Sequence, residues 1–234
     1  MDVLTVISPV FGARCSVLVA ADGSCVVVDP GALVAPHVVA LVRERALRPV
    51  AVLLTHGHVD HCWDAAEVGG ALGVPVRVHA ADAYRLADPF GTLGALGGRP
   101  HDPDGPLAQA LRAAGADPTT YRVPTDVETF GSVGGGRDDE LAPVPGWDLV
   151  ARHAPGHTQG STLYLVGPLV LTGDVLFAGT IGRTDLPGGD GDEMARTLRE
   201  VVATLDPALV VVPGHGPTSD VATELATNPY LVGR

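Results

Sequence analysis

The sequence contains no lysine. All 15 of its basic residues are arginine, set against 27 acidic residues, and the formal net charge is −12. A protein whose main partner is a phosphate backbone needs clustered positive charge, which this balance does not provide, so nucleic acid is not the expected partner. A bound divalent cation would offset part of the negative charge wherever acidic side chains converge on it.

Cysteines and long apolar runs are also scarce. Cys15, Cys25 and Cys62 have no paired spacing, which favours small buried thiols in a reducing cytosol over a disulfide framework. No apolar run approaches the roughly 20 residues that span a bilayer. The first residues, MDVLTVISPVFG, carry Asp2 and no basic residue, so they make a poor secretory signal. We expect a soluble, cytoplasmic protein that has no membrane partner.

Apolar residues are abundant, at 46% of 234 residues, which is enough to bury a core. Alternating and β-branched runs predict strands, and helical periodicity predicts helices between them. The predicted strands are at about 3–7, 14–20, 24–29, 50–55, 75–79, 147–152, 161–166, 168–172 and 208–212, and the predicted helices are near 32–47, 62–70, 80–87, 190–204 and 217–226. Asp60, and Asp190 with Glu193, are candidate helix N-terminal signals.

The two halves of the chain share an order of adjacent strands, a helix and a strand that ends in a histidine loop. This order predicts a strand-rich layered core with helices outside it and a site where the strand ends meet. Residues 88–146 interrupt the pattern with Gly- and Pro-rich stretches and one short helical segment, LAQALRAAG. Long irregular stretches in compact domains are usually functional, so we expect an insertion with mobile parts at the rim of the site.

Four metal-capable side chains fall within six positions of the stretch THGHVDH, directly behind an apolar run: His56, His58, Asp60 and His61. Burying three imidazoles and a carboxylate without a metal would be costly. His56 and His58 can lean toward one ion if the loop curls, whereas Asp60 and His61 begin the next helix and point elsewhere, which suits a second ion.

Three further candidate ligands lie in glycine-containing loops: His157 in APGHTQGS, Asp174 in LVLTGDVLF and His215 in VVVPGHG. Glycine beside a ligand lets backbone segments approach closely. Imidazole and carboxylate ligands favour Zn²⁺, Fe²⁺ or Mn²⁺. His37, His79 and His101 have no second candidate ligand near them in sequence, so we expect structural roles for them.

THGHVDH, APGHTQGS, TGDVLF and PGHG, in that order, resemble the motifs of the metallo-β-lactamase superfamily over almost the whole chain. The resemblance implies an α+β fold, a four-layered αββα sandwich, formed by residues 1–234 as a single domain that carries the insertion at about 88–146. It implies one metal held by His56, His58 and His157 and a second held by Asp60, His61 and His215, with Asp174 bridging them and Asp60 also catalytic. A cysteine stands at the position of Asp174 in several true β-lactamases, which disfavours that activity.

LFAGTIGRTDLPGGD and GHGPTSDVATELATNPYL resemble the short, single-domain glyoxalase II-like hydrolases, although Leu225 stands where an arginine is expected. This similarity implies a small-molecule substrate, a thioester of a low-molecular-weight thiol, cleaved by attack of metal-bound hydroxide with two divalent ions, most plausibly zinc, with iron or manganese as alternatives. Arg183, Thr184 and Asp185 are expected to support the ligands or form a wall of the site. Cys62 is expected to pack in the first helix turn and not to act as a nucleophile.

Two alternatives stay open. Persulfide dioxygenases share the skeleton and use one iron, which His56, His157 and Asp174 would hold here as a facial triad. A nuclease or a scaffold without activity is disfavoured, because no basic groove is visible and no ligand is lost. The motifs leave the oligomeric state, the metal and the physiological substrate open.

Overall fold

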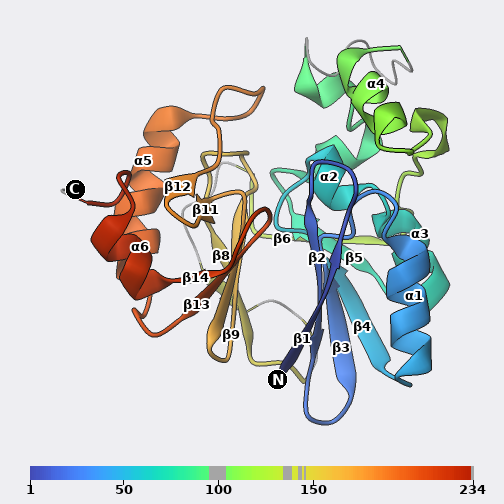
Figure 1. Ribbon diagram of the computed structural model, residues 1–234, viewed down its shortest axis with the longest axis horizontal. Coiled ribbons are helices and arrows are strands. Elements are labelled where there is room, and N and C mark those ends of the chain that lie inside the picture. Colours follow the sequence, from blue (N-terminus) through green and yellow to red (C-terminus); the bar gives the residue numbers. More distant parts are fainter. Residues whose placement is uncertain (95–103, 134–138, 142–143, 145, 233–234) are drawn as a thin grey trace.

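Two six-stranded sheets pack face to face, and helices cover the outer face of each (Figure 1). The computed structural model describes residues 1–94, 104–133, 139–141, 144 and 146–232. The first sheet consists, in spatial order, of β1 (Asp2–Ile7), β2 (Arg14–Val19), β3 (Ser24–Val28), β4 (Arg48–Leu53), β5 (Val76–His79) and β6 (Val127–Phe130). The second consists of β14 (Ser219–Asp220), β13 (Val210–Pro213), β10 (Leu169–Gly173), β9 (Thr162–Val166), β8 (Leu149–His153) and β7 (Asp139–Leu141).

The helices form the two outer layers and the rim. The α-helices are α1 (Ala35–Glu44), α2 (Val59–Cys62), α3 (Ala65–Leu72), α4 (Pro106–Ala113), α5 (Gly191–Glu200) and α6 (Val221–Thr227). Four 3₁₀ helices are η1 (Ala83–Ala87), η2 (Gly91–Leu93), η3 (Pro118–Thr120) and η4 (Val202–Thr204), and a small hairpin joins β11 (Leu176–Phe177) to β12 (Thr180–Ile181). In Figure 1, α1 and α3 flank the first sheet, α5 and α6 flank the second, and α4 lies above α2.

The inner strands β2 and β3 of the first sheet are mostly apolar on both faces because both of their faces are buried. In β3, Cys25 and Val27 pack toward α1 and α3, while Val26 and Val28 face the second sheet. The same alternation places Tyr164 of β9 between the sheets, where its hydroxyl donates to the carbonyl of Leu54 at 2.9 Å. Strands buried on two faces are continuously hydrophobic, which is why the runs in the sequence show little alternation.

The α+β prediction of a four-layered αββα sandwich is confirmed, and each of the nine predicted strands is present within a few residues. The predicted helix at 62–70 is two segments, α2 and α3, and the one at 80–87 is the 3₁₀ helix η1. Asp190 does cap α5, since its Oδ1 accepts the amide of Glu193 at 2.9 Å. Asp60 lies in the first turn of α2, whose N-cap is His58, and its carboxylate faces His61 and His215.

The stretch 88–146 is more regular than its composition predicts. It contributes β6, which pairs in parallel with β5, and β7, which pairs antiparallel with β8, so it supplies an edge strand to each sheet. Their sequences, VETF and DEL, are short and contain no apolar run of the kind that identified the other strands. The predicted helix in LAQALRAAG is confirmed as α4. The expected mobile parts lie partly outside the described residues, at 95–103, 134–138, 142–143 and 145.

Candidate metal centre

The candidate ligands lie in loops and in the short helix α2 at one edge of the sandwich, where parallel strands end. The loop after β4 carries His56 and His58, and the loops after β10 and β13 carry Asp174 and His215. Because β3 is parallel to β4 and β10 is parallel to β13, their carboxyl ends meet at this edge. Gly214 lets the last loop approach, since a Cβ there would lie 2.5 Å from Asp174 Oδ1 and 2.7 Å from the His61 ring.

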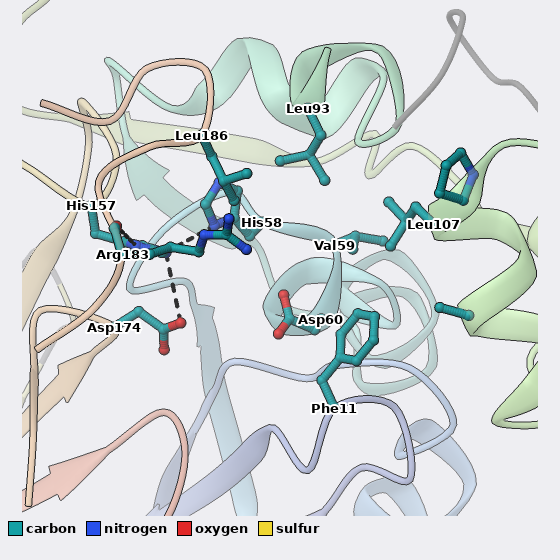
Figure 2. Close-up of a pocket in the computed structure, with 12 residues that line it drawn as sticks. Phe11, His58, Val59, Asp60, Leu93, Leu107, His157, Asp174, Arg183 and Leu186 are labelled. Atoms are coloured by element: carbon teal, nitrogen blue, oxygen red, sulfur yellow. Dashed lines mark hydrogen bonds and ion pairs between the residues drawn. The ribbon is translucent and has the colours of Figure 1, made fainter. Parts of the chain in front are cut away.

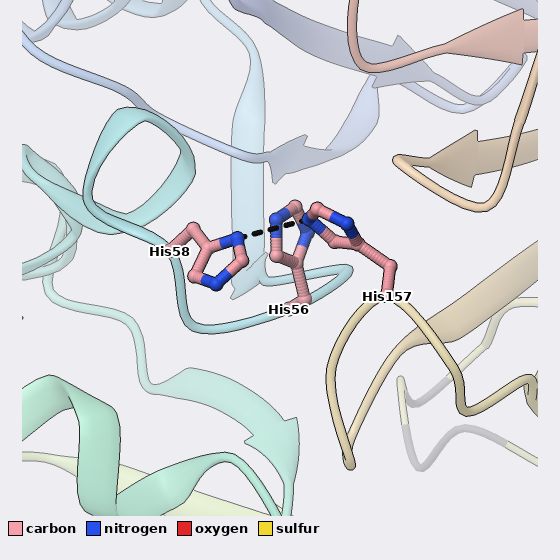
Figure 3. A group of neighbouring side chains, drawn as sticks. All are labelled: His56, His58 and His157. Atoms are coloured by element: carbon pink, nitrogen blue, oxygen red, sulfur yellow. Dashed lines mark hydrogen bonds between the residues drawn. The ribbon is translucent and has the colours of Figure 1, made fainter. Parts of the chain in front are cut away.

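His56, His58 and His157 form the first group of candidate ligands (Figure 3). His157 comes from the connection between β8 and β9 in the second sheet, so this group joins the two halves of the chain. His58 Nδ1 lies 2.9 Å from His157 Nε2, and the three rings are 1–6% exposed. The ligand atoms of the three lie within 4.8 Å of one another, close enough to converge on one ion.

Asp60, His61 and His215 form the second group. His215 Nε2 lies 3.2 Å from His61 Nε2 and 3.3 Å from Asp60 Oδ2. Asp174 lies between the groups: its Oδ2 is 3.6 Å from His157 Nε2 and 3.5 Å from His215 Nε2, and its Oδ1 is 3.4 Å from His61 Nε2. The seven side chains singled out in the sequence are therefore all brought together, in two groups linked by one carboxylate.

The hydrogen bonds of the outward ring nitrogens orient four imidazoles toward the centre. The hydroxyl of Thr55 donates to Asp29 Oδ2, so it accepts from Nδ1 of His56 at 3.0 Å. The Nδ1 atoms of His61, His157 and His215 donate to Asp29 Oδ2 (3.1 Å), the Arg183 carbonyl (2.7 Å) and the Phe11 carbonyl (3.1 Å). In the neutral form of each ring, Nε2 then has its lone pair facing the cluster, the arrangement typical of metal-binding histidines.

Three buried atoms of the cluster have no hydrogen-bond partner among the described residues: His56 Nε2, His58 Nε2 and Asp174 Oδ1. Unsatisfied buried polar atoms are rare in folded proteins, and each calls for an explanation such as a bound ion. The orphaned His56 Nε2 and Asp174 Oδ1, with the inward lone pairs, fit divalent metal. The cluster has nitrogen and oxygen donors only, as expected for Zn²⁺, Fe²⁺ or Mn²⁺.

The electrostatics of the two groups differ. Burial lowers the pKa of His56 well below its ordinary value, and burial together with His157 lowers the pKa of His58 to about 3, so both rings are neutral and able to ligate. Burial also acts to lower the pKa of His61, but the carboxylates of Asp174 and Asp60 outweigh it and raise that pKa. The second group thus has an excess of negative charge. A proton on His61 offsets this charge, and a bound divalent cation would replace that proton.

Asp29 supports both groups and was not singled out in the sequence. It is 2% exposed, follows β3, and takes the unusual positive φ of 52°. Its Oδ1 accepts the amide of Thr55, and its Oδ2 accepts from the Thr55 hydroxyl and from His61. A charged residue directly behind the apolar run SCVVV was the available signal, because such a residue is buried at a strand end.

Asp82 is a second support that the sequence analysis missed. It is fully buried, and its carboxylate accepts the amides of Gly57 and Gly160 at 2.8 and 2.9 Å and the hydroxyl of Thr158 at 2.7 Å. It therefore ties the loop of His56 and His58 to the loop of His157. Its charge is offset by Arg85, equally buried, whose Nε lies 3.3 Å from Asp82 Oδ1. Nothing in the sequence around Asp82 indicates these distant partners.

The other predicted residues have varied surroundings. Arg183 lines the cavity beside the cluster and is ion-paired with Asp185, while Thr184 and Asp185 do not line it. Cys62 is fully buried in the core, where burial raises the pKa of its thiol, as expected for a packed residue. His79 is also buried, stacked on His153 at a ring distance of 4.0 Å. His37 is exposed on α1, and His101 lies outside the described residues.

A cavity of about 340 Å³ opens beside the cluster (Figure 2). His58, Asp60, His157 and Asp174 are among the residues that line it. The size is within the range of small-molecule sites, so a ligand in this cavity would have its polar group against the candidate metal ligands. An αββα sandwich with this cluster at its edge defines a class of protein with a candidate two-metal centre.

The chain belongs to the metallo-beta-lactamase superfamily, whose family model matches residues 10–215. It is 33% identical to the probable metallo-hydrolase YqgX of Bacillus subtilis (91% of this chain, 89% of the relative). It is 26% identical to the hydroxyacylglutathione hydrolase GloC of Haemophilus influenzae (94% and 93%). No helix formed by the described residues has the length and apolar character needed to cross a membrane.

Two solved structures are similar over nearly all of both chains. The B3 metallo-beta-lactamase BLEG-1 has a TM-score of 0.75 and 28% identity, covering 98% of this chain and all of that one. TTHA1623, solved in a di-iron-bound form, has a TM-score of 0.74 and 28% identity, covering 97% and 100%. A neighbour thus binds two metal ions in the same fold.

Proposed function

We propose that the protein is a dinuclear metallohydrolase that cleaves a thioester of a low-molecular-weight thiol, as the name of GloC describes for that relative. The observation that carries the proposal is Asp174, whose two oxygens lie within 3.6 Å of ligands of both groups, beside an open cavity. Two divalent ions held there would supply a nucleophilic water at neutral pH and polarise a carbonyl.

The protein's own residues would orient the reaction. The first group and the second group lie on either side of Asp174, so the thioester carbonyl would be held where His58, Asp60 and His157 border the cavity. Asp60 has a side chain 15% exposed, and its carboxylate faces His215 and His61, where it can hold the second ion. A thiolate is a good leaving group, and no buried general acid is needed beside it.

The proposal is tested by hydrolysis of S-D-lactoylglutathione by the zinc-loaded protein and by Asp60→Ala. We expect the substitution to lower kcat/KM by at least about 100-fold, as for other groups that stabilise developing charge, and to reduce bound zinc from two ions to one per chain. Equal rates for both proteins would rule out the two-metal mechanism.

The second candidate is a mononuclear iron persulfide dioxygenase, with His56, His157 and Asp174 as the iron ligands. Two imidazoles and a carboxylate are the ligand set of oxygen-activating iron sites. Both classes can keep Asp60, His61 and His215, so the metal content and the oxygen chemistry distinguish them. One iron per chain, with oxygen uptake on glutathione persulfide, would establish the dioxygenase instead.

A further inference from the structure

The cavity beside the metal centre has two chemically different ends. Its wall also carries apolar side chains from four separate segments: Val59, Leu93, Pro106, Leu107, Ala110 and Leu186. Figure 2 shows Asp174 and His157 on one side and Leu107 on the other, with Val59 and Asp60 between them. Val59 lies between the ligands His58 and Asp60 in sequence, so the apolar wall begins directly at the reacting centre.

This wall is held in place by a hydrophobic cluster behind it. Val59, Leu93 and Leu107 are 2–8% exposed and pack in one cluster with Trp63 and Phe90. The rings of Trp63 and Phe90 meet edge to face at 5.8 Å. The wall is therefore preformed, and a ligand that packs against it does not have to order these side chains first.

The charges around the cavity do not suit a second anionic group. Among the described residues that line it, Arg183 is the one cationic side chain apart from the histidines. Its Nε and Nη2 atoms already bond to the two carboxylate oxygens of Asp185, at 2.6 and 2.7 Å. A carboxylate of a ligand placed on the apolar wall would lose water without gaining a counter-charge.

We propose that this wall binds the acyl chain of the substrate and selects longer aliphatic acyl groups over acetyl and over polar acyl groups. The inference rests on the proposed thioesterase function. When a thioester binds with its carbonyl at the metal ligands, either its acyl chain or its thiol part must lie along the apolar wall. Small cellular thiols carry amides and charges, whereas the acyl group is the part that can be wholly apolar, so the acyl chain fits the wall and the thiol fits the open mouth.

The first test uses acetyl, butanoyl, hexanoyl and octanoyl thioesters of N-acetylcysteamine, a small uncharged thiol, with the zinc-loaded protein. Each methylene buried on the wall should raise kcat/KM about threefold to fourfold until the wall is filled. A flat or falling series would overturn the proposal, as would hydrolysis of S-D-lactoylglutathione ten times faster than that of the hexanoyl thioester.

The second test uses a variant that fills part of the space beside the wall. Ala110 faces the cavity from α4, and Ala113 lies exposed on the same helix. Ala110→Leu should lower the ratio of hexanoyl to acetyl kcat/KM at least about tenfold, because the added methyl groups occupy the space of the chain. Ala113→Leu is the matched control and should leave the ratio unchanged. An equal ratio in Ala110→Leu and the wild type would refute the assignment of the wall.

A binding measurement separates this inference from the proposed function. Calorimetry with acetate, butanoate, hexanoate and octanoate should show affinity that increases with chain length in the wild type and much less in Ala110→Leu. If no thioester is hydrolysed but this trend is seen, the thioesterase assignment fails and the apolar subsite stands. If thioesters are hydrolysed without any dependence on chain length, the function stands and the subsite fails. If the protein neither hydrolyses thioesters nor binds the carboxylates, both the proposed function and the apolar subsite are overturned.

Discussion

Asp29 Oδ2 accepts a hydrogen bond from Nδ1 of His61 at 3.1 Å and another from the hydroxyl of Thr55. The Thr55 hydroxyl in turn accepts from Nδ1 of His56. One carboxylate beneath the site therefore sets the orientation of an imidazole in each of the two ligand groups. Both bonds favour the tautomer in which Nδ1 carries the proton and Nε2 of the neutral ring has its lone pair facing the cluster. Asp29 is thus as much a part of the centre as the ligands are.

Asp29→Asn should weaken metal binding about 10- to 100-fold, most of all at the second group. The amide oxygen can keep the bond to the Thr55 amide, which places the NH₂ group against His61 Nδ1. That ring must then accept at Nδ1 and carry its proton at Nε2, toward the metal. Competition with a chelator measures the affinity. Asp22→Asn, in the exposed turn before β3, is the matched control, and an equal affinity in all three proteins would contradict the prediction.

Asp82→Ala should lower the free energy of unfolding by about 3–5 kcal/mol, because it leaves the buried guanidinium of Arg85 without its counter-charge. Urea denaturation measures the loss. The double variant Asp82→Ala with Arg85→Met should lose less than the sum of the two single variants, since it leaves no uncompensated charge. Strict additivity would show that the ion pair is not what couples them.

Gly214→Ala should abolish binding of one metal ion while the fold is retained. The added methyl group would press on Asp174 Oδ1 and on the His61 ring, both of which line the centre. Metal content by mass spectrometry, with circular dichroism for the fold, checks the result. Gly70→Ala is the control, since its Cβ would meet open space on the exposed side of α3, where it should add up to about 1 kcal/mol of stability. Two metals per chain in Gly214→Ala would be incompatible with the close approach.

The stacked pair His79 and His153 should make the protein sensitive to acid. Burial, followed by His153, lowers the pKa of His79 to about 4, while Asp82 acts weakly in the other direction. The unfolded chain binds the proton from about pH 6.5 downward, but the folded chain binds it only near pH 4. Stability that is full above pH 6.5 is therefore lost as the pH falls through this window.

His79→Phe removes the titrating group and keeps the ring between Phe130 and His153. The difference in stability between the wild type and this variant should change by about 1–3 kcal/mol between pH 7 and pH 4, in favour of the variant at low pH. Thermal denaturation at a series of pH values measures it. Parallel pH profiles for the two proteins would show that His79 does not titrate in this window.

Much of this protein could be predicted from local patterns. The seven ligands were recognisable because each stands in a short motif behind an apolar run, and a strand end places such a motif at the edge of a sheet. The nine predicted strands were recognisable as apolar or β-branched runs, and burial on both faces makes an inner strand such as β3 continuously apolar. The edge strands β6 and β7, with four and three residues, depend on pairing with β5 and β8 and have no comparable signal.

The sequence by itself determined the layered fold, the identity of the candidate ligands and their division into two groups. Only the tertiary structure decided which ring nitrogens face inward, because that depends on Asp29, Arg183 and Phe11, which lie far from the histidines in sequence. It also decided that Asp82 ties two ligand loops together and that an apolar wall faces the metal centre. Side-chain contacts between distant segments produce these features, and no local pattern of residues encodes them.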